Sequence, residues 1–545
     1  MWRALMPASP LHFDAVIAGG GFAGVYCARA LEAKLGNSAR ERVALIASEN
    51  FMLFQPMLAE VAGSALPPQH VVNPIRQLCR NVTVLRGEIT EIDLDAHRLT
   101  VSAGDFVGNV IVTFRHLVAG LGGTVDLSRV PGMAEHAFLM KNIGDALKLR
   151  DALIGRFEEA NMEEDARDIR RLLTFVIVGG GFSGVETSGQ LLDFTRELLS
   201  FYPRLPADAL RIVLIHGRDR LMPELSASLA KYCEDNLRNR GLEIILNARV
   251  SAMTAGRIQL DDGRVIESRT VVSTVGSAPH PLLVALSRKS GLPCEKGRLL
   301  TDATMRVKGR SDLWAAGDCA AVPMPPNPRQ GAGAPSAREF SPSTAQFALR
   351  QGALLGRNLA RALQGSGDFQ AFRFRGLGEL TSLGHHAAAA EILGLKFSGF
   401  FAWWLWRSIY LMKLPGFERK LRVLLDWTLD LFFPADITSF QAQPTQVLKL
   451  MHLEKGDVLC HAGEPAFSFY IVKAGLIELR NPTGAVERTM TPGRHFGKST
   501  ILHNLAWPYT AVATEPSEVM AISAQTLKAI SNTRMTLRPA EPGSR

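Results

Sequence analysis

Short apolar runs alternate with amphipathic stretches over most of the chain. Most of these runs are shorter than a typical helix and are bounded by glycine, proline or charged residues, which is typical of buried strands in a parallel sheet. Strands that alternate with helices in this way predict an α/β fold built from βαβ units. The apolar runs lie at residues 13–18, 42–47, 109–122, 175–178, 211–216, 271–276 and 313–319.

The first apolar run leads directly into a glycine-rich turn. Gly19, Gly21 and Gly24 stand between this run and a helical stretch at 25–31. Glycine lets the backbone approach a phosphate closely, and the free N–H groups at the helix start, with the helix dipole, then hold the negative charge. A single turn of this kind is also compatible with tight packing alone. The residues expected to contact the first diphosphate are Gly19, Gly21, Phe22, Ala23 and Gly24.

The same turn occurs a second time, which weakens the packing explanation. Residues 175–186 repeat the apolar run, the triple glycine and the start of a helix. Two such turns imply two cofactors that contain diphosphates, and the fold class is then α/β with two Rossmann-like dinucleotide-binding domains. We expect the second diphosphate to contact Gly179, Gly181, Phe182, Ser183 and Gly184.

In domains of this kind an acidic residue at the end of the second strand usually binds the adenosine ribose hydroxyls. The first domain has Ala47 at this point, and Glu49 is the nearest carboxylate. Glu49 is therefore the candidate, although a solvated loop glutamate fits equally well. The second domain has His216, with Arg218 close by, instead of an acid. A histidine and an arginine leave open whether the nicotinamide cofactor is NADH or NADPH.

Further strand ends carry glycine or aspartate. An aspartate at the carboxyl edge of a strand can approach a ribityl chain and a diphosphate through hydrogen bonds or a bridging water. The order of the runs indicates that the chain leaves the first domain, builds the second and returns to the first. The strand-end residues expected near the cofactors are Gly120, Gly122, Gly276, Gly317 and Asp318.

The composition is that of a globular protein with several domains. The chain has 545 residues, of which 47% are apolar and 21% are charged, and this length predicts about two to four domains. The formal net charge of +9 is modest and suits an anionic membrane or anionic cofactors, because no nucleic-acid-binding module accompanies it. The six cysteines lack paired spacing, which indicates a reducing compartment and argues against zinc and against a redox-active disulfide. The first dozen residues lack the features of a secretory signal, so we expect a cytoplasmic start.

These features together resemble the two-dinucleotide-binding flavoproteins and, within them, the type II NADH dehydrogenases. These are single-subunit, non-proton-pumping NADH:quinone oxidoreductases. The resemblance spans roughly residues 13–434 and is carried by residues 53–62 with 73–76, 179–190 and 344–352. It implies FAD at the first turn, NADH at the second with NADPH possible, and a membrane quinone as the electron acceptor. A quinone takes both electrons directly from reduced flavin, so this reaction needs no cysteine pair.

The resemblance also implies roles for individual residues. Glu186 matches the family's Val-Glu pair near the nicotinamide and flavin, although a glutamate in the first turn of a helix is also favoured by the dipole. Ala345, Gln346 and Gln351 match the quinone-site helix, where the two glutamines would bond flavin or quinone carbonyls. Alternatively, the two glutamines are polar residues that face the solvent and have no role in catalysis. We assign Glu186, Gln346 and Gln351 to catalysis.

Residues 396–434 predict a peripheral membrane anchor. Arg407 and Lys413 interrupt the aromatic stretch at 396–414 before it reaches the length of a membrane span. In the next stretch apolar residues recur at helical spacing from Phe417 to Phe432, and basic residues lie near one end, which suits an anionic membrane surface. A core or dimer-interface helix is the alternative. His385 and His386 have no carboxylate or cysteine nearby that could complete a metal site, so no metal is expected.

The resemblance also implies a homodimer.

Beyond Pro434 the chain changes to short β-rich runs separated by glycine turns, over about residues 447–530. This part resembles a cyclic-nucleotide-binding domain, a small β-barrel. The family's Phe-Gly-Glu turn and Pro-Arg pair here read Phe496–Gly497–Lys498 and Pro508–Tyr509. Without the arginine the clamp on the cyclic phosphate is lost. We expect a degenerate sensor or interaction domain that does not bind cyclic nucleotides, although Lys498 could retain another anion.

The predicted organisation has five segments and a peripheral location on the cytoplasmic face of the inner (plasma) membrane. Two other functions remain open: a soluble flavoprotein that reduces a protein partner, in which residues 396–434 form a dimer interface, and a non-catalytic redox sensor. The segments are an FAD domain at 13–150 and 291–385, an NAD(P)H domain at 151–290, membrane-association helices at 386–434 and the barrel at 436–530.

Overall fold

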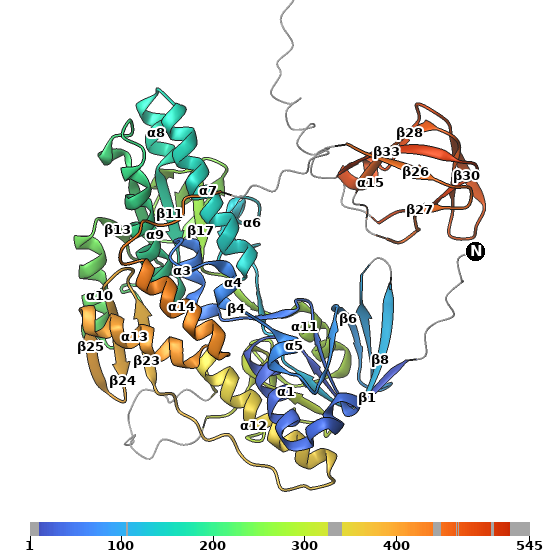
Figure 1. Cartoon of the computed structure of the whole chain (residues 1–545), viewed down its shortest axis with the longest axis horizontal. Helices are drawn as coiled ribbons and strands as arrows, with labels where there is room; N and C mark the ends of the chain where they lie inside the picture. The colour runs from blue at the N-terminus through green and yellow to red at the C-terminus, as the bar shows by residue number, and fades with distance from the viewer. Residues whose placement is uncertain are drawn as a thin grey trace, which may run out of the picture. The chain divides into compact units, whose positions relative to one another are not determined.

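The predicted apolar runs form the strands of two separate sheets (Figure 1). The first sheet has the order β5-β2-β1-β8-β7-β6, and β21 pairs with β8. Its strands β5, β2, β1, β8 and β21 are parallel, whereas β6 and β7 form an antiparallel ribbon on β8. The bounds are β1 Leu11–Ala18, β2 Val43–Ala47, β5 Thr83–Arg86, β6 Glu88–Asp93, β7 Arg98–Ser102, β8 Asn109–Ala119 and β21 Leu313–Ala315.

The second sheet is entirely parallel and has the order β10-β17-β11-β12-β13. Strand β11 is buried along its whole length, which explains its continuous apolar sequence. A small antiparallel sheet, β14-β15-β16, lies between β13 and β17 in the chain. The bounds are β10 Phe138–Leu139, β11 Thr174–Val178, β12 Arg211–Ile215, β13 Leu242–Ile245, β14 Val250–Thr254, β15 Arg257–Leu260, β16 Val265–Glu267 and β17 Thr270–Ser273.

A helix begins directly after each glycine turn, α1 (Phe22–Leu35) after β1 and α9 (Phe182–Ser200) after β11. Helix α12 (Ala345–Leu363) packs closely on α1 because it presents glycine there. A Cβ at Gly352 would lie 2.1 Å from Ala23 O, and one at Gly356 would lie 2.4 Å from Cys27 O. This close approach fixes the start of α12 beside the first glycine turn.

The chain crosses between the two domains through a pair of short antiparallel strands, β9 (Gly123–Val125) and β18 (Ser277–Pro279). Strand β10 already pairs in the second sheet, and α7 (Ile143–Met162) packs in the core of that domain. The second domain therefore begins before the predicted residue 151. On the return, α11 (Pro281–Ser290) places Leu283 and Leu286 in the first core, before the predicted residue 291.

A third sheet and two helices close this part of the chain. The sheet has the order β23-β24-β25, with strands Gly378–Ser382, Ala388–Ile392 and Leu395–Ser398. Helix α13 (Gly399–Lys413) buries Trp403, Trp406 and Arg407, and α14 (Phe417–Leu429) buries Val423 and Trp427. In the described part of the chain, no helix is both long enough and apolar enough to cross a bilayer.

The structure is a computed structural model that describes residues 10–104, 107–324, 340–439, 448–464, 466, 468–502 and 506–523. It divides into two units, Met1–Ser439 and Phe440–Arg545. The expectation about a secretory signal rests mainly on residues 1–9, which lie outside the described residues, as do 440–447 and 524–530 of the predicted barrel segment.

The second unit contains two four-stranded antiparallel sheets, β26-β33-β28-β31 and β27-β32-β29-β30. A short helix, α15 (Lys498–Leu502), follows the Phe496–Gly497 turn. The strand bounds are β26 Leu448–Leu453, β27 Val458–Cys460, β28 Ser468–Ala474, β29 Ile477–Arg480, β30 Val486–Met490, β31 His495–Phe496, β32 Thr510–Ala513 and β33 Ser517–Ser523.

Short elements connect these larger ones. They are α2 Ala39–Arg42, β3 Phe51–Leu53, α3 Leu58–Ala62, α4 Pro68–Val71, β4 Val72–Pro74, α5 Ile75–Leu78, α6 Met133–His136, α8 Ala166–Leu172, α10 Ala227–Asn239, β19 Cys294–Glu295, β20 Arg298–Leu300 and β22 Ala320–Ala321.

Candidate functional site

The first glycine turn is built so that the chain reverses sharply between β1 and α1. Gly19 has φ +116°, and a Cβ at Gly24 would lie only 1.9 Å from Gly19 O, so neither position accepts a side chain. Gly21 is the N-cap of α1 and carries no capping side chain, and a Cβ there would meet nothing within 4 Å. The N–H groups at the start of α1 therefore face open space, as a bound diphosphate requires.

The second turn has the same construction. Gly179 has φ +114°, and a Cβ at Gly184 would lie 1.7 Å from Gly179 O. Gly181 is the uncapped N-cap of α9, and the space beside it is open. The two glycine turns predicted from the sequence are thus both present, each before an uncapped helix start, and Phe182 and Ser183 form the first residues of α9.

The predicted strand-end residues lie around the first turn and the domain crossing. Gly120 donates its N–H to Ala18 O at 2.8 Å, and the Gly122 N–H lies 3.1 Å from Cys319 Sγ. Gly276 accepts a hydrogen bond from the Asp126 N–H at 2.7 Å, so it stands at the crossing between the domains. Asp318 follows Gly317 in a short turn after β21. Glu49 is exposed just beyond β2.

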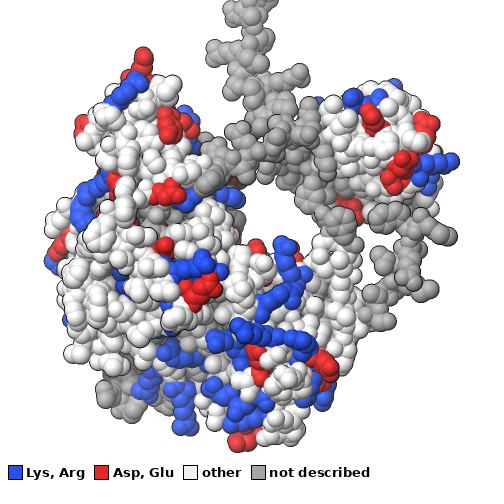
Figure 2. All heavy atoms as spheres, viewed as in Figure 1, with Lys and Arg blue, Asp and Glu red and all other residues white. Residues whose placement is uncertain are grey.

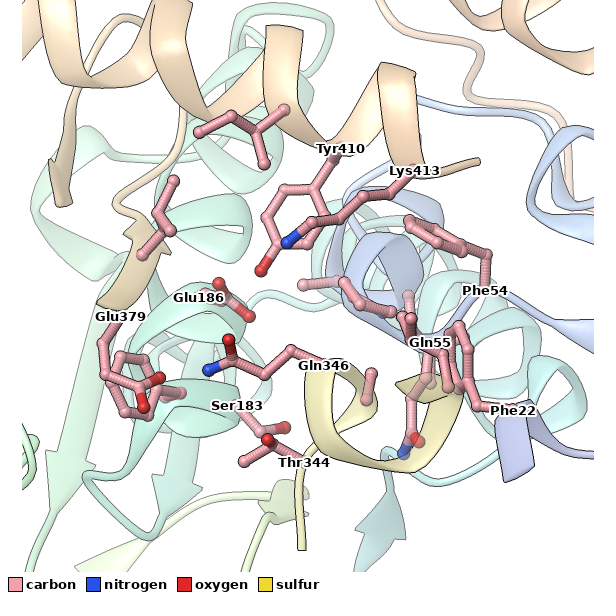
Figure 3. Close-up of a pocket in the computed structure, with 18 of the residues that line it drawn as sticks. Phe22, Phe54, Gln55, Ser183, Glu186, Thr344, Gln346, Glu379, Tyr410 and Lys413 are labelled. Atoms are coloured by element: carbon pink, nitrogen blue, oxygen red, sulfur yellow. The ribbon is translucent and has the colours of Figure 1, made fainter. Parts of the chain in front are cut away.

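A cavity of about 570 Å³ lies where these elements meet (Figure 3). Its walls come from the starts of α1, α9 and α12, from the segment that leads into α3, from Asp318, from β23 and from α13. The walls are mostly apolar, and a few polar side chains reach into the space, which is the usual character of a site for a flat organic ring. The polar lining residues labelled in Figure 3 are Gln55, Ser183, Glu186, Thr344, Gln346, Glu379, Tyr410 and Lys413.

Glu186 lies in the first turns of α9 and points into this cavity toward Tyr410 and Gln346 (Figure 3). Burial raises the pKa of Glu186 to about 8, and the negative charge of Glu60 adds to this rise. The Ser382 N–H lies 3.4 Å from Glu186 Oε1 and lowers the pKa, which opposes the rise. The carboxyl group therefore carries its proton at neutral pH. A perturbed carboxyl in a cavity is a typical feature of a site that moves protons.

The two predicted glutamines of α12 have different environments. Gln346 lines the cavity, and its amide donates to Gly378 O at 3.2 Å and accepts from the Leu377 N–H at 3.3 Å. Gln351 is buried, lies outside the cavity lining and accepts a hydrogen bond from the Gly317 N–H at 2.8 Å. Gln351 thus holds the turn that carries Asp318. Ala345, also expected at this site, lines the cavity.

Tyr410 and Lys413 on α13 were not predicted as site residues. Burial raises the pKa of the Tyr410 hydroxyl, and the charge of Glu186 contributes to this shift. Burial lowers the pKa of Lys413, and Arg350 contributes to the lowering. Their i, i+3 spacing places both residues on one face of a helix, and this spacing is visible in the sequence. The surrounding aromatic residues, however, led to the prediction of a membrane anchor and not of a cavity wall.

A buried polar cluster joins α13 and α14 to the first domain. Glu60 is 4% exposed, and burial raises its pKa to about 7. Arg407 lies between the Trp403 and Trp427 rings, 4.0 Å and 4.8 Å from their centroids, and pairs with Asp430 at 3.6 Å. This cluster fixes the helix that carries Tyr410 and Lys413 over the cavity.

The histidine pair that was excluded as a metal site has other contacts. His385 lies 3.3 Å from Asp430, and the His386 ring packs against Trp403. Among the residues that the structure describes, no group of histidine, cysteine or acidic side chains has the arrangement of a metal site.

In the second unit, aromatic side chains gather beside the turn at Phe496 and Gly497. Trp507 is 3% exposed and contacts the rings of Tyr470, Phe496 and Tyr509. Burial raises the pKa of Tyr509 to about 12. A Cβ at Gly497 would lie 2.5 Å from the Trp507 ring, so this ring packs directly on the turn before Lys498.

The donors and the space around both turns fit dinucleotide cofactors. Each turn combines an uncapped helix start with glycines that leave room for phosphate, and the cavity lies between the two helix starts. The chain can therefore hold FAD at the first turn and a nicotinamide cofactor at the second.

Comparisons with known proteins agree with this geometry. Residues 13–352 match the pyridine nucleotide-disulphide oxidoreductase family, residues 377–436 match the NDH2 C-terminal domain, and residues 450–534 match the cyclic nucleotide-binding domain. The type II NADH:quinone oxidoreductase Ndh of Mycobacterium tuberculosis is 30% identical over 77% of this chain and 88% of its own length. The type II enzyme NdhA of the same organism is 28% identical over 82% of this chain and 94% of its own length.

A solved structure of NDH2 from Plasmodium falciparum in complex with NADH has the same fold. Its TM-score is 0.71 at 17% identity, and the match covers 78% of this chain and 99% of that chain. The chain therefore belongs to the type II NADH:quinone oxidoreductases, within the pyridine nucleotide-disulphide oxidoreductase family, and carries a C-terminal domain of the cyclic nucleotide-binding family.

Proposed function

We propose that this chain binds FAD at the first glycine turn and NADH at the second, and that it reduces a membrane quinone in the cavity between them without pumping protons. The observation that carries the proposal is the meeting of both helix starts with Glu186, Gln346 and Tyr410 around one cavity. Bound FAD supplies the group that takes a hydride from NADH and returns two electrons to the acceptor. The family assignment favours this function over a soluble reductase of a protein partner.

The role of the helix starts is to hold and orient the two nucleotides. The N–H groups of α1 and α9 bind the diphosphates, and the glycines keep side chains out of the way. Gln351 fixes Gly317, so that Asp318 is presented to the ribityl chain and diphosphate of FAD. Gln346 is tied to β23 by two hydrogen bonds, which holds the α12 wall of the cavity in place.

Glu186 provides the proton that quinone reduction needs. A quinone becomes a quinol with two electrons and two protons, which is one proton more than a hydride brings. Glu186 is protonated at neutral pH because burial raises its pKa to about 8. Its position beside Tyr410 in the cavity suits a general acid for the quinone oxygen (Figure 3).

The surface formed by α13, α14 and residues 431–433 is proposed to lie in an anionic membrane. Figure 2 shows a largely uncharged area there. Two residues of this surface are very exposed, Phe417 at 82% and Phe432 at 77%. Aromatic and aliphatic groups on a helix face suit the membrane interface. The other exposed apolar residues are Phe400, Phe401, Trp404, Met412, Leu421, Leu424, Leu425, Leu429, Leu431 and Phe433.

This surface also gives the quinone a route from the lipid. Met412 and Lys413 line the cavity, and Met412 is exposed on α13. The electron acceptor then enters from the bilayer, and the nucleotides bind from the aqueous side. We place the enzyme as a peripheral protein on the cytoplasmic face of the inner (plasma) membrane. The homodimer stays a prediction that light scattering of the purified enzyme would test.

The C-terminal domain is proposed to act without a cyclic nucleotide. Tyr509 stands where the family has its phosphate-binding arginine, and Trp507 packs on the turn that precedes Lys498. A neutral phenol does not replace the paired donors of a guanidinium.

The experiment that tests the proposed function is an assay of purified protein for bound FAD and for NADH oxidation. We expect a yellow protein that oxidises NADH much faster when a short-chain quinone is added. A folded protein that contains no FAD, or whose NADH oxidation does not respond to quinone, would contradict the proposal.

A further inference from the structure

The two dinucleotide-binding domains can be compared residue by residue at the ends of their second strands. The Gly19 N–H donates to Ile46 O at 2.8 Å in the first domain, and the Gly179 N–H donates to Ile215 O at 2.8 Å in the second. Ile46 and Ile215 are therefore equivalent positions. Each strand then continues to the place where an adenosine ribose is bound.

The next residues, Ala47 and His216, are also equivalent. A Cβ at Gly20 would lie 2.7 Å from Ala47 Cβ, and a Cβ at Gly180 would lie 2.8 Å from His216 Cγ. Each of these side chains therefore packs on the middle glycine of its own turn. Two residues further along, Glu49 of the first domain corresponds to Arg218 of the second.

This pair of residues has opposite consequences for a ribose. A carboxylate accepts hydrogen bonds from the two ribose hydroxyls and repels a phosphate at the 2′ position. A guanidinium does not repel a ribose or a 2′-phosphate, and it binds the phosphate through charge-assisted hydrogen bonds. The first domain thus has the residue type for an unphosphorylated ribose, and the second has the residue type for a 2′-phosphate.

A second guanidinium approaches the same backbone from the neighbouring loop. The Ala248 N–H donates to His216 O at 3.1 Å, and the Asn247 N–H donates to Arg218 O at 3.0 Å. Arg249 follows and lies over Gly217, where a Cβ would be 3.1 Å from its Nε. Arg218 and Arg249 are both exposed, and within the described residues neither side chain has an ion-pair or hydrogen-bond partner.

His216 packs beside this place, and its ring joins the end of β12 to the second glycine turn. Its Nδ1 accepts from the Gly180 N–H at 3.0 Å, so the proton of the neutral ring is on Nε2. Nε2 is buried and has no hydrogen-bond partner among the described residues. Burial lowers the pKa of His216, and the charge of Arg218 lowers it further. Asp219 is close, but it corresponds to Asn50 and not to Glu49.

We propose that Arg218 and Arg249 form a subsite for the 2′-phosphate of NADPH, so that the second domain accepts NADPH as well as NADH. This inference rests on the proposed binding of a nicotinamide cofactor at the second glycine turn. It adds a specific subsite that an enzyme restricted to NADH would lack.

The test measures the binding of NAD⁺ and NADP⁺ to the FAD-loaded enzyme by calorimetry, because these oxidised forms bind without reacting. We expect NADP⁺ to bind at least as tightly as NAD⁺, and its affinity to fall more steeply as salt is added. Arg218→Glu gives the second domain the residue of the first. This variant should weaken NADP⁺ by about tenfold or more. NAD⁺ should bind at least as tightly as it does to wild type, because the new carboxylate accepts hydrogen bonds from the ribose hydroxyls.

Arg257→Glu is the matched control, because Arg257 is exposed on β15 and the charge change is the same. We expect it to leave both affinities unchanged. The inference is overturned if wild-type enzyme binds NADP⁺ more than about tenfold more weakly than NAD⁺, or if Arg218→Glu and Arg257→Glu have equal effects. Reduction of the flavin by NADH is measured separately, so a failure of the 2′-phosphate subsite is distinguishable from a failure of the proposed function.

Discussion

Replacement of Glu186 by glutamine tests the proton donor of the cavity. Glutamine has nearly the same shape as a protonated glutamate, but it cannot release a proton. With a pKa raised to about 8, wild-type Glu186 is about nine-tenths protonated at pH 7 and about one-tenth protonated at pH 9. The rate of quinone reduction by the reduced enzyme should therefore fall about tenfold for each pH unit above 8.

The glutamine variant should lose this dependence together with most of the rate. A positioned general acid typically contributes at least about 100-fold, so we expect quinone reduction at pH 7 to slow by about that factor. Reduction of the flavin by NADH needs no proton and should change by less than about twofold. Stopped-flow measurements of the two half-reactions from pH 6 to pH 9 would show both effects.

The stability of the same variant gives a second, independent result. A carboxyl group whose pKa is raised in the folded state destabilises that state as pH rises from 4.5 to about 8, since ionisation is easier after unfolding. The cost has a ceiling of about 5 kcal/mol, and it is smaller in practice because Glu186 is only partly buried. Glu186→Gln should therefore be more stable than wild type above pH 8 and equal to it near pH 5.

A matched control is Glu135→Gln in α6, which changes an exposed glutamate. Its thermal unfolding should follow wild type at every pH. The reasoning about Glu186 is refuted if Glu186→Gln reduces quinone at the wild-type rate, or if its stability relative to wild type is the same at pH 5 and pH 9.

Three other substitutions or additions have clear expected outcomes. Gly24→Ala places a Cβ 1.9 Å from Gly19 O, so the purified variant should contain little flavin by absorbance, whereas Gly155→Ala, with nothing within 4 Å, should keep it. Leu425→Glu places a charge in the proposed membrane surface, at a position where the leucine side chain is 54% exposed. The affinity for anionic vesicles, measured by cosedimentation, should fall by about tenfold, while NADH still reduces the flavin. Cyclic AMP should leave the melting temperature of the full chain unchanged, because we propose that Tyr509 stands in place of the phosphate-binding arginine. A rise that depends on the concentration of cyclic AMP would show that the domain still binds it.

The sequence was sufficient for the features that depend on local backbone geometry. The glycine turns at Gly19 and Gly179 require positive φ and close contact between a turn and its own helix, and both requirements act within a few residues. The buried strands were equally clear, because β11 and its neighbours are covered on both faces and so have continuous apolar sequences. The helical periodicity of α14 was also correct.

The features that depend on contacts between distant segments were not predictable. Gln351 was grouped with Gln346 because both lie on α12, but only the fold shows that it bonds Gly317. Tyr410 reaches the cavity only because the fold brings α13 and the start of α9 to the same cavity. Strand β10 was not predicted from the sequence, because a strand of only two residues shows no periodic pattern.

The most direct test of the account is a single-turnover experiment on the FAD-loaded enzyme without oxygen. One equivalent of NADH is mixed with the enzyme, and the flavin absorbance is followed while a short-chain quinone is then added. We expect NADH to bleach the flavin band completely and the quinone to restore it in one step, more slowly in Glu186→Gln. A flavin that NADH does not bleach, or that quinone does not reoxidise, would contradict the proposed NADH:quinone oxidoreductase activity.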